Sequence, residues 1–198
     1  MNHQGTIRIE TDRLMLRRFT MEDADAMYRN WASDDEVTKY LTWPTHTSIS
    51  VTRAVLEEWI QKYEERDFYN WAIELKEIGE PIGSISVVSY ETRTAAASIG
   101  WCIGKHWWGQ RITPEAGRAV LQYLFEHIGF NRIAAKHDED NAGSGRVMQK
   151  IGMKREGILR ASGKNNQGIV DEVYYSILRD EYEKRDAKSM KFIWRIDS

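Results

Sequence analysis

Apolar positions along the chain recur with two periods, one typical of helices and one typical of strands. Spacings of three and four residues predict helices that begin after Thr20, cover residues 49–65, begin after Thr113 and cover residues 141–151. Alternation of apolar and polar side chains predicts strands at residues 12–18, 71–75, 85–87, 99–103 and 132–136, and on both sides of a turn at 163–168. Interleaved helices and strands predict a mixed sheet with helices on both faces.

Capping residues mark several helix boundaries. Thr20 is followed three residues later by Asp23, which is the spacing of a capping box. Asn141 is a favoured residue at a helix start, and Gly152 stands where the fourth helix would end in a left-handed residue. Residues 97–136 read as strand, loop, helix and strand, a crossover that predicts two parallel strands side by side.

The junction inside this crossover has the features of a phosphate-binding turn. A strand runs into a loop that contains Gly109, and the loop then meets a helix start. Thr113 is a good N-cap, Pro114 suits the first helical position, and Glu115 is favourable at the positive end of the helix dipole. Loop amides and free helix N–H groups that point one way bind phosphate, so the sequence predicts a phosphorylated ligand.

Composition and charge narrow the class of protein. The chain has 198 residues, 41% of them hydrophobic and 29% charged, which is ordinary for a globular domain. A net charge of −2 does not favour nucleic acid as a partner. The sequence has no apolar stretch of about 18 residues, the length of a membrane span, and its first residues do not form a secretory signal. Cys102 is the single cysteine; it is expected to be a small buried residue, and the protein to be cytoplasmic.

Five blocks in order make the chain similar to the GCN5-related N-acetyltransferases (GNAT), specifically those of the RimJ/RimL type. The resemblance covers about residues 10–182. The blocks are residues 11–17, 83–85, 99–116, 141–153 and 171–178. The resemblance implies the GNAT fold, a mostly antiparallel sheet of about seven strands that splits into a V between its two central parallel strands. It also implies one domain over residues 1–182, followed by an extension over residues 183–198.

The resemblance implies acetyl-coenzyme A as donor, a primary amine as acceptor, and direct transfer without a covalent acetyl-enzyme or a metal. Gly109 matches the glycine of the family's pyrophosphate-binding run, whereas Arg111 stands where a glycine or alanine is usual. Arg111 could add a charge contact to a phosphate, or it could strain the turn and weaken the site. The residues expected to contact the cofactor are Trp101, Cys102, Ile103, Trp108, Gly109, Gln110, Arg111, Ile112, Thr113, Asn141, Ser144 and Val147.

Two of these residues carry specific roles in the resemblance. Asn141 would hold the pantetheine amides, because its side chain both donates and accepts; helix capping is the alternative role. Many relatives use a tyrosine to protonate the departing thiolate, but Met148 stands at that position here. Ser144 is therefore the predicted donor to the leaving group, in line with the RimJ/RimL type.

The general base is less defined by the sequence. Glu115 is the predicted base, and compensation of the helix dipole is its alternative role. Glu74, Asp171 and Glu172 are further carboxylates that could face the cleft. The base could also act through a water relay, or the acceptor could bind already neutral.

Aromatic residues are numerous and predict a lined acceptor cleft. The aromatic residues in segments that cover this cleft in the family are Trp31, Tyr40, Trp43, Tyr69 and Tyr90. Trp31, Trp43 and Tyr90 are the predicted acceptor contacts. The leading acceptor is the N-terminal α-amino group of a protein or peptide, with a small-molecule amine such as a polyamine, amino acid or antibiotic as the alternative. A non-catalytic acyl-coenzyme A sensor is the alternative from another class. A homodimer is expected, and Phe192, Ile193 and Trp194 could cover a partner's surface.

Overall fold

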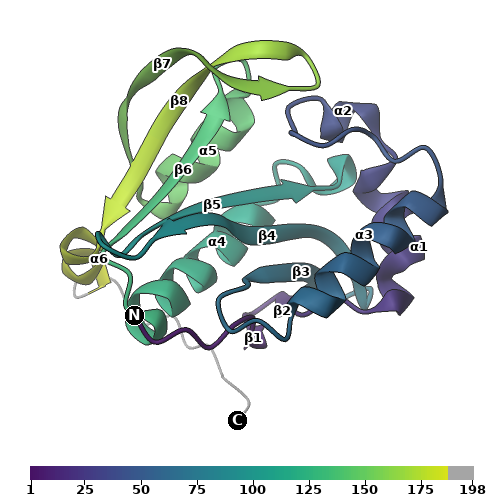
Figure 1. Cartoon of the computed structure of the whole chain (residues 1–198), viewed down its shortest axis with the longest axis horizontal. Helices are drawn as coiled ribbons and strands as arrows, with labels where there is room; N and C mark the ends of the chain where they lie inside the picture. Colours follow the sequence, from purple (N-terminus) through teal and green to yellow (C-terminus); the bar gives the residue numbers. More distant parts are fainter. Residues whose placement is uncertain (187–198) are drawn as a thin grey trace.

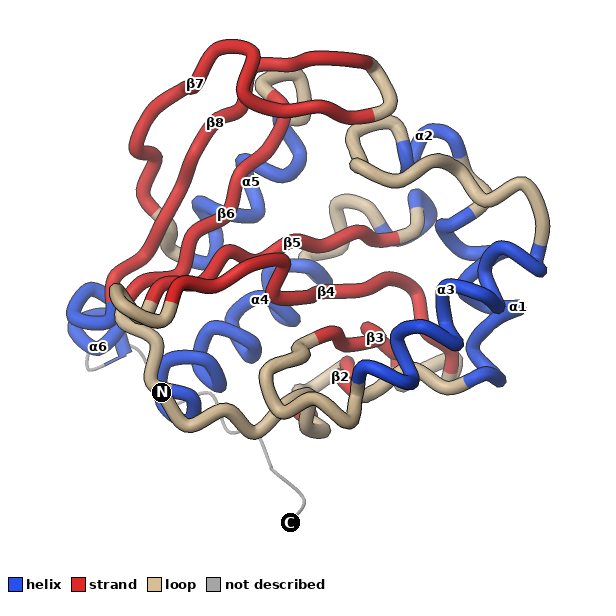
Figure 2. Tube along the Cα trace, viewed as in Figure 1, coloured by secondary structure: helices blue, strands red, loops and turns tan. Residues whose placement is uncertain are grey.

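A single mixed sheet organises residues 1–186, the part of the chain that the computed structural model describes (Figures 1 and 2). Eight strands of this part follow the order β1-β2-β3-β4-β5-β6-β8-β7. Their bounds are β1 Ile9–Glu10, β2 Leu14–Arg17, β3 Asn70–Leu75, β4 Glu80–Glu91, β5 Ala96–Ile103, β6 Arg132–Asp138, β7 Lys154–Asn165 and β8 Gly168–Leu178. The α-helices are α1 Ala24–Met27, α2 Asp35–Thr38, α3 Ile49–Lys62, α4 Ile112–Tyr123, α5 Ala142–Ile151 and α6 Arg179–Asp186. Short 3-10 or π turns adjoin them at η1 Met21–Asp23, η2 Tyr28–Ala32, η3 Lys105–Trp107 and η4 Leu124–Ile128.

The sheet divides between β5 and β6, as predicted. Among the described strands these two form the one parallel pair, and every other pair is antiparallel. They are paired only where Ala96 to Ser98 meets Arg132 to Ala134. Beyond that point β5 continues to Ile103 and β6 to Asp138 without pairing to each other, so the two strands diverge (Figure 1). The V-shaped split expected from the sequence is confirmed.

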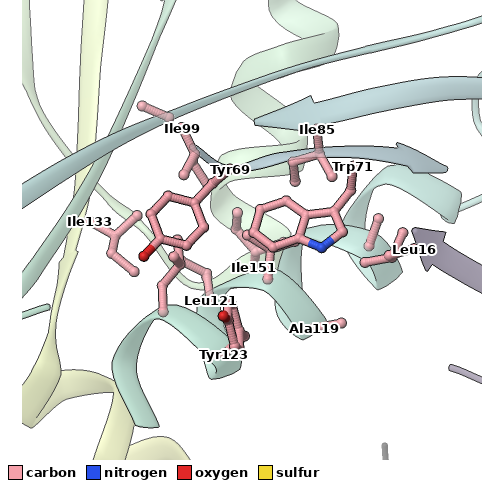
Figure 3. Packing of buried hydrophobic residues seen from close by; sticks show 14 of the residues in the cluster. Leu16, Tyr69, Trp71, Ile85, Ile99, Ala119, Leu121, Tyr123, Ile133 and Ile151 are labelled. Atoms are coloured by element: carbon pink, nitrogen blue, oxygen red, sulfur yellow. The ribbon is translucent and has the colours of Figure 1, made fainter. Parts of the chain in front are cut away.

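Two apolar cores lie on opposite faces of the sheet. On one face, β3, β4, β5 and β6 pack against α4 and α5; Figure 3 shows Trp71 stacked beside Tyr69 and meeting Tyr123 edge-on. The polar atoms of this core are paired, since Trp71 Nε1 donates to Ile7 O at 2.7 Å and Tyr123 OH to Gly5 O at 2.8 Å. On the other face, α1, η2 and α3 cover Ala72 and Cys102.

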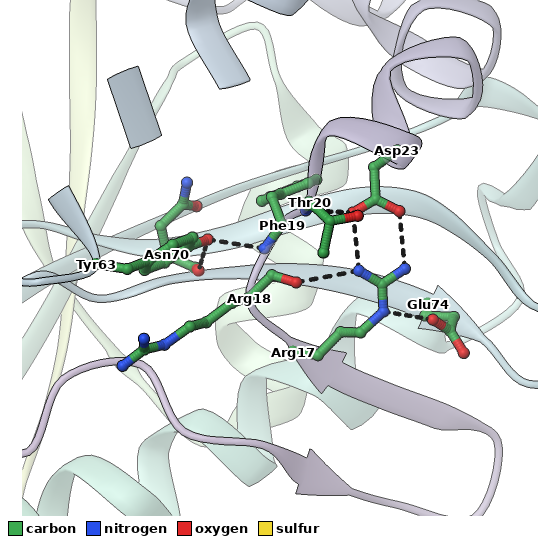
Figure 4. A network of polar contacts seen from close by, with 8 residues as sticks. All are labelled: Arg17, Arg18, Phe19, Thr20, Asp23, Tyr63, Asn70 and Glu74. Atoms are coloured by element: carbon green, nitrogen blue, oxygen red, sulfur yellow. Dashed lines mark hydrogen bonds and ion pairs between the residues drawn. The ribbon is translucent and has the colours of Figure 1, made fainter. Parts of the chain in front are cut away.

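A polar network joins the entry to the first helix with the sheet (Figure 4). The Arg17 guanidinium donates to both carboxylate oxygens of Asp23 at 2.8 Å and to Glu74 Oε2 at 2.5 Å. Thr20 N donates to Asp23 Oδ2 at 2.8 Å, which completes the predicted capping box. Glu74 is therefore held by Arg17 on this network, and its alternative role as a base is not supported by its position.

Two local predictions need correction, and two short elements were not predicted. The helix predicted after Thr113 begins at Ile112, because Arg111 turns the chain with a left-handed backbone and so takes the N-cap position. The predicted turn at 163–168 is shorter, since β7 continues to Asn165. Strand β1 and helix α2 were not predicted, because each is too short to show a period.

The C-terminal part of the described chain is helix α6. Helix α6 runs across the expected domain boundary at residue 182, and Arg185 Nη1 donates to Ile151 O at 3.1 Å. Phe192, Ile193 and Trp194 lie outside the described residues.

Candidate active site

A cleft of about 460 Å³ opens where β5 and β6 diverge. Five segments line it: the loop after α2, the end of β5, the turn before α4, the first turn of α4, and the start of α5. The lining residues are Glu36, Val37, Tyr40, Leu41, Trp101, Cys102, Ile103, Trp107, Trp108, Gly109, Arg111, Ile112, Thr113, Pro114, Asp140, Asn141, Ala142, Gly143, Ser144, Arg146, Val147 and Lys150. The cleft thus brings together the starts of two helices and the end of a strand that are far apart in sequence.

The turn before α4 is built from two left-handed residues. Gly109 has φ +78° and Arg111 has φ +61°. An added Cβ at Gly109 would meet nothing within 4 Å, so the need for glycine there comes from the backbone angle. Trp108 Nε1 donates to Ile103 O at 2.9 Å and ties the turn to the end of β5. Ile112 and Thr113, the first two residues of α4, belong to the cleft lining. An α-helix leaves the N–H groups of its first residues without partners inside the helix.

Of the predicted turn residues, Gln110 is the exception. It is outside the cleft lining, and its Nε2 donates to His106 O at 2.9 Å. A contact between the Gln110 side chain and a cofactor is not supported by this position, because the amide is already engaged within the turn.

The start of α5 supplies the second helix terminus. Asn141 is the N-cap, and its Oδ1 accepts from Ser144 N at 3.3 Å. Asn141 Nδ2 approaches Ser144 Oγ at 3.3 Å, so the two predicted residues form one hydrogen-bonded pair inside the cleft lining. The predicted C-cap at Gly152 is also present, with φ +95°.

Two cations at the cleft were not predicted. Arg146 and Lys150 follow Ser144 on α5 and line the cleft together with Val147. The signal was present in the sequence, because positions 143, 146, 147 and 150 share one face of a helix. With Arg111 these side chains make the end of the cleft near α4 and α5 basic, whereas Glu36 and Asp140 line it near α2.

The end of β5 lines the cleft with Trp101, Cys102 and Ile103. Burial raises the pKa of the Cys102 thiol, and the hydrogen bond with Ser84, with Sγ and Oγ 3.3 Å apart, opposes that effect only in part. The thiol is therefore neutral near pH 7, which fits the expected buried residue and not a nucleophile.

Glu115 is held by hydrogen bonds away from the cleft, and its position does not support the predicted role as a catalytic base. It is buried, with 7% of its surface exposed, and it is not part of the cleft lining. Its Oε1 accepts from Thr11 Oγ1 at 2.6 Å and from Arg13 N at 3.0 Å, and its Oε2 accepts from Arg13 Nε at 2.7 Å. A side chain in the first turn of α4 can point toward the sheet or toward the cleft. The side chain of Glu115 points toward the segment before β2.

The three aromatic residues predicted for the acceptor cleft are also placed elsewhere. Trp31 has no exposed surface and lies in the core under α1 and α3. Tyr90 OH donates to Asp67 Oδ2 at 2.6 Å, and Tyr90 pairs with Ala97, at the end where β5 and β6 are still joined. Trp43 packs near His46, with ring centroids 5.2 Å apart. On the α2 side of the cleft the aromatic residue in the lining is Tyr40, which was not among the predicted acceptor contacts.

Residues 1–186 contain neither a candidate membrane-spanning helix nor a candidate metal site. No helix within residues 1–186 is long and apolar enough to span a membrane. The same residues contain no group of three or more His, Cys, Asp or Glu side chains that could hold a metal ion.

Comparison with known proteins identifies the family of this chain. The family described as "Acetyltransferase (GNAT) domain" matches residues 13–154. The uncharacterized N-acetyltransferase p20 of Bacillus licheniformis is 31% identical over 87% of this chain and 96% of its own length. The uncharacterized N-acetyltransferase YoaA of Bacillus subtilis is 33% identical, over 86% of this chain and 96% of its own length.

A solved structure agrees as well. The GNAT-family acetyltransferase from Bacillus anthracis has a TM-score of 0.78 at 28% identity, covering 88% of this chain and all of that one. This chain belongs to the GNAT acetyltransferase family. It is an acyltransferase, and the resemblance of its five sequence blocks to the GNAT acetyltransferases is confirmed at the level of the family.

Proposed function

We propose that this acyltransferase moves the acetyl group of acetyl-coenzyme A directly onto a primary amine, and that the amine is the N-terminal α-amino group of a peptide or protein. One observation carries the proposal. The starts of α4 and α5 and the unpaired end of β5 line one cleft. These are the three groups that the phosphates, the pantetheine arm and the thioester of the cofactor need.

The phosphate end fits the residues present. Free N–H groups at the start of α4 bind anions, and the helix dipole favours negative charge there. Arg111, Arg146 and Lys150 add positive charge in the same part of the cleft lining. The fold is shared at 21% identity and a TM-score of 0.75 by the microcin C7 self-immunity acetyltransferase MccE, whose structure holds acetyl-CoA and AMP.

Asn141 is proposed to bind the pantetheine arm. Its Oδ1 already caps α5 through Ser144 N, but an amide oxygen has two lone pairs and its nitrogen has two donors. Free backbone groups of β5 beyond Ser98 would pair with the amides of the arm, because the split leaves that edge without a neighbouring strand.

Transfer itself needs an aligned amine and a polarised thioester carbonyl. It also needs a group to take the proton of the amine and a donor to the departing thiolate. A backbone N–H near Cys102 would stabilise the oxyanion as the amine nitrogen adds to the thioester carbon. As the carbon–sulfur bond breaks, the hydroxyl of Ser144 would donate to the departing thiolate. We place the amine at the α2 end of the cleft, where Asp140 favours a cation and the proton of the amine can leave through water. Glu36 lines the same end, but its carboxylate is ion-paired with Lys105 at 2.6 Å.

A small-molecule amine is the second candidate acceptor. Tyr40 and Leu41 line the α2 end of the cleft, which suits a compact acceptor as well as a chain end.

The ribosomal-protein-S5-alanine acetyltransferase from Vibrio fischeri has a TM-score of 0.78 at 16% identity, a likeness that concerns the fold alone.

The test is thiol release from acetyl-coenzyme A with a panel of short peptides and small amines, for the wild type and for Ser144→Ala. We expect release with free peptide N-termini, and a fall in kcat of about 100-fold in Ser144→Ala with little change in cofactor affinity. Release with small amines alone would favour the second candidate. Cofactor binding without release from any acceptor would contradict the transfer and indicate the sensor.

A further inference from the structure

The loop at residues 38–43, here named the acceptor loop, is held across the cleft by the turn between β7 and β8. Asn166 Nδ2 donates to Thr38 O at 2.9 Å and to Trp43 O at 2.8 Å. Asn166 N donates to Leu41 O at 3.2 Å. One residue, more than 120 positions away in sequence, thus binds the beginning, the middle and the end of this loop.

The β7–β8 hairpin is shaped to reach this loop. Its strands are 12 and 11 residues long, and the register shifts between Arg155 and Gly157 and between Leu159 and Gly163. Such irregularities bend a strand and increase its twist. Figures 1 and 2 show the tip of the hairpin curving toward the loop that follows α2. Asn165 Nδ2 also donates to Asp138 Oδ2 at 2.6 Å, which fixes the tip to the end of β6.

The acceptor loop forms the α2 side of the cleft. Tyr40 and Leu41 belong to the cleft lining, and Tyr40 OH approaches Asp140 O at 3.4 Å across it. The loop is therefore supported from two sides, by the hairpin tip and by the start of α5. An acceptor that approaches the thioester from this end meets a wall whose position depends on both supports.

We propose that Asn166 is a positioning residue for acceptor selection: it holds the acceptor loop in place, so that only a chain end or a small amine reaches the thioester. The inference rests on the proposed function and deepens it. An internal lysine on a folded protein would have to displace the loop, whereas a peptide N-terminus or a compact amine enters end-on.

Asparagine suits this position for a chemical reason. Its amide group supplies two N–H donors, and each meets a backbone carbonyl of the loop. Aspartate has the same shape but no donor, and its charge would face two carbonyl oxygens. Alanine would leave both carbonyls without this partner, so only the backbone hydrogen bond from residue 166 N to Leu41 O would still join the loop to the hairpin, while the rest of the cleft kept its contacts.

The test compares Asn166→Asp and Asn166→Ala with the wild type, and uses Gln167→Ala on the same turn as the matched control. Amide hydrogen exchange of residues 38–46 is measured in each, together with acetyl-coenzyme A affinity and the KM and kcat for the best acceptor of the panel. We expect exchange in the loop to rise about tenfold or more in both Asn166 variants, since each lost hydrogen bond contributes about 1 kcal/mol. Gln167→Ala should match the wild type.

The kinetic arm separates a positioning role from a merely structural one. In both Asn166 variants we expect the KM for the acceptor to rise about tenfold, cofactor affinity to stay within about twofold, and bulkier amines to become substrates. Unchanged loop exchange, or an equal loss of cofactor and acceptor binding, would overturn the inference. A wild type that binds no acetyl-coenzyme A would overturn the proposed function, while the exchange result would still decide whether Asn166 holds the loop.

Discussion

Arg111 combines a strained backbone with a charge inside the cleft. Its φ of +61° and ψ of +16° are left-handed, a conformation that costs a residue with a Cβ about 1 kcal/mol. The family resemblance places glycine or alanine here, which left open whether the arginine aids or weakens the site. Strain kept at a cofactor site suggests that the guanidinium contributes to binding.

Replacement of Arg111 separates these two effects. We expect Arg111→Gly to raise the free energy of unfolding by up to about 1 kcal/mol, because glycine adopts this backbone without strain. The same variant should bind acetyl-coenzyme A about tenfold more weakly, because a charge contact to a phosphate is lost. Chemical denaturation and calorimetry measure the two quantities, and Arg111→Lys serves as the control that keeps the charge. Unchanged affinity in Arg111→Gly would show that the guanidinium is dispensable.

Asn141 has two roles that single substitutions can distinguish. Asn141→Ala should lose about 1 kcal/mol of stability together with the cap, and Asn141→Ser should keep the cap and the stability. Both should bind acetyl-coenzyme A about tenfold more weakly, because neither side chain reaches the pantetheine amides as asparagine does. Thermal unfolding and calorimetric titration give both numbers. Full affinity in Asn141→Ser would leave capping as the only role of this residue.

At the scale of the elements, Glu115 fastens α4 to the segment before β2. Burial of the carboxyl opposes its ionisation, but the hydrogen bonds from Thr11 and Arg13 and the charge of Arg13 outweigh burial and lower the pKa of Glu115. A carboxyl whose pKa is lower in the folded protein stabilises the fold above its unfolded pKa of about 4.3, and this contribution disappears as the pH falls through the folded value.

This linkage gives a pH-dependent prediction. We expect Glu115→Gln to lower the free energy of unfolding by about 2 kcal/mol at pH 7, and the difference from the wild type to shrink as the pH falls from about 4.5 toward 3. Denaturant unfolding at several pH values measures it. Glu57, which is exposed on α3, provides a Glu→Gln control. A difference independent of pH across this window would argue against an ionised Glu115 as the fastening group.

The elements differ in how well the sequence predicted them. Helix α5 was predicted closely, because Asn141 and Gly152 are local signals whose geometry lies within the helix itself. The start of α4 was misplaced by two residues, since Arg111 is not a residue that normally takes a left-handed cap. The length of β7 was underestimated because its last residues are ordered by contacts with Asp138 and by pairing with β8, which no local pattern encodes.

At the scale of the whole molecule, the sheet separates two apolar cores, and it splits between strands β5 and β6. The cofactor side of the cleft comes from consecutive segments after β5 and β6, so sequence blocks predicted Gly109, Asn141 and Ser144 as neighbours of one cleft. The acceptor side comes from the loop after α2 and the β7–β8 turn, which meet only in the folded chain. Sequence reasoning therefore named Tyr40 among the aromatic residues over the cleft without singling it out, and its choice of Trp31 and Tyr90 as acceptor contacts is not supported by their positions.

The assembly of the molecule stays a prediction. The expected homodimer and the boundary at residue 182 are proposals, and the apolar residues Phe192 to Trp194 lie beyond the described part of the chain. Sedimentation of the full chain and of a chain ending at residue 186 would show whether that segment changes the oligomeric state.

The central claim, that this cleft binds acetyl-coenzyme A, is tested most directly by calorimetric titration of the wild-type chain with that cofactor at two temperatures. Two temperatures are needed because a binding enthalpy can pass through zero at one of them. We predict one molecule bound per chain, with an affinity that falls as salt is added, because Arg111, Arg146 and Lys150 line the phosphate end of the cleft. No binding at either temperature would contradict the account of the cleft and, with it, the proposed reaction.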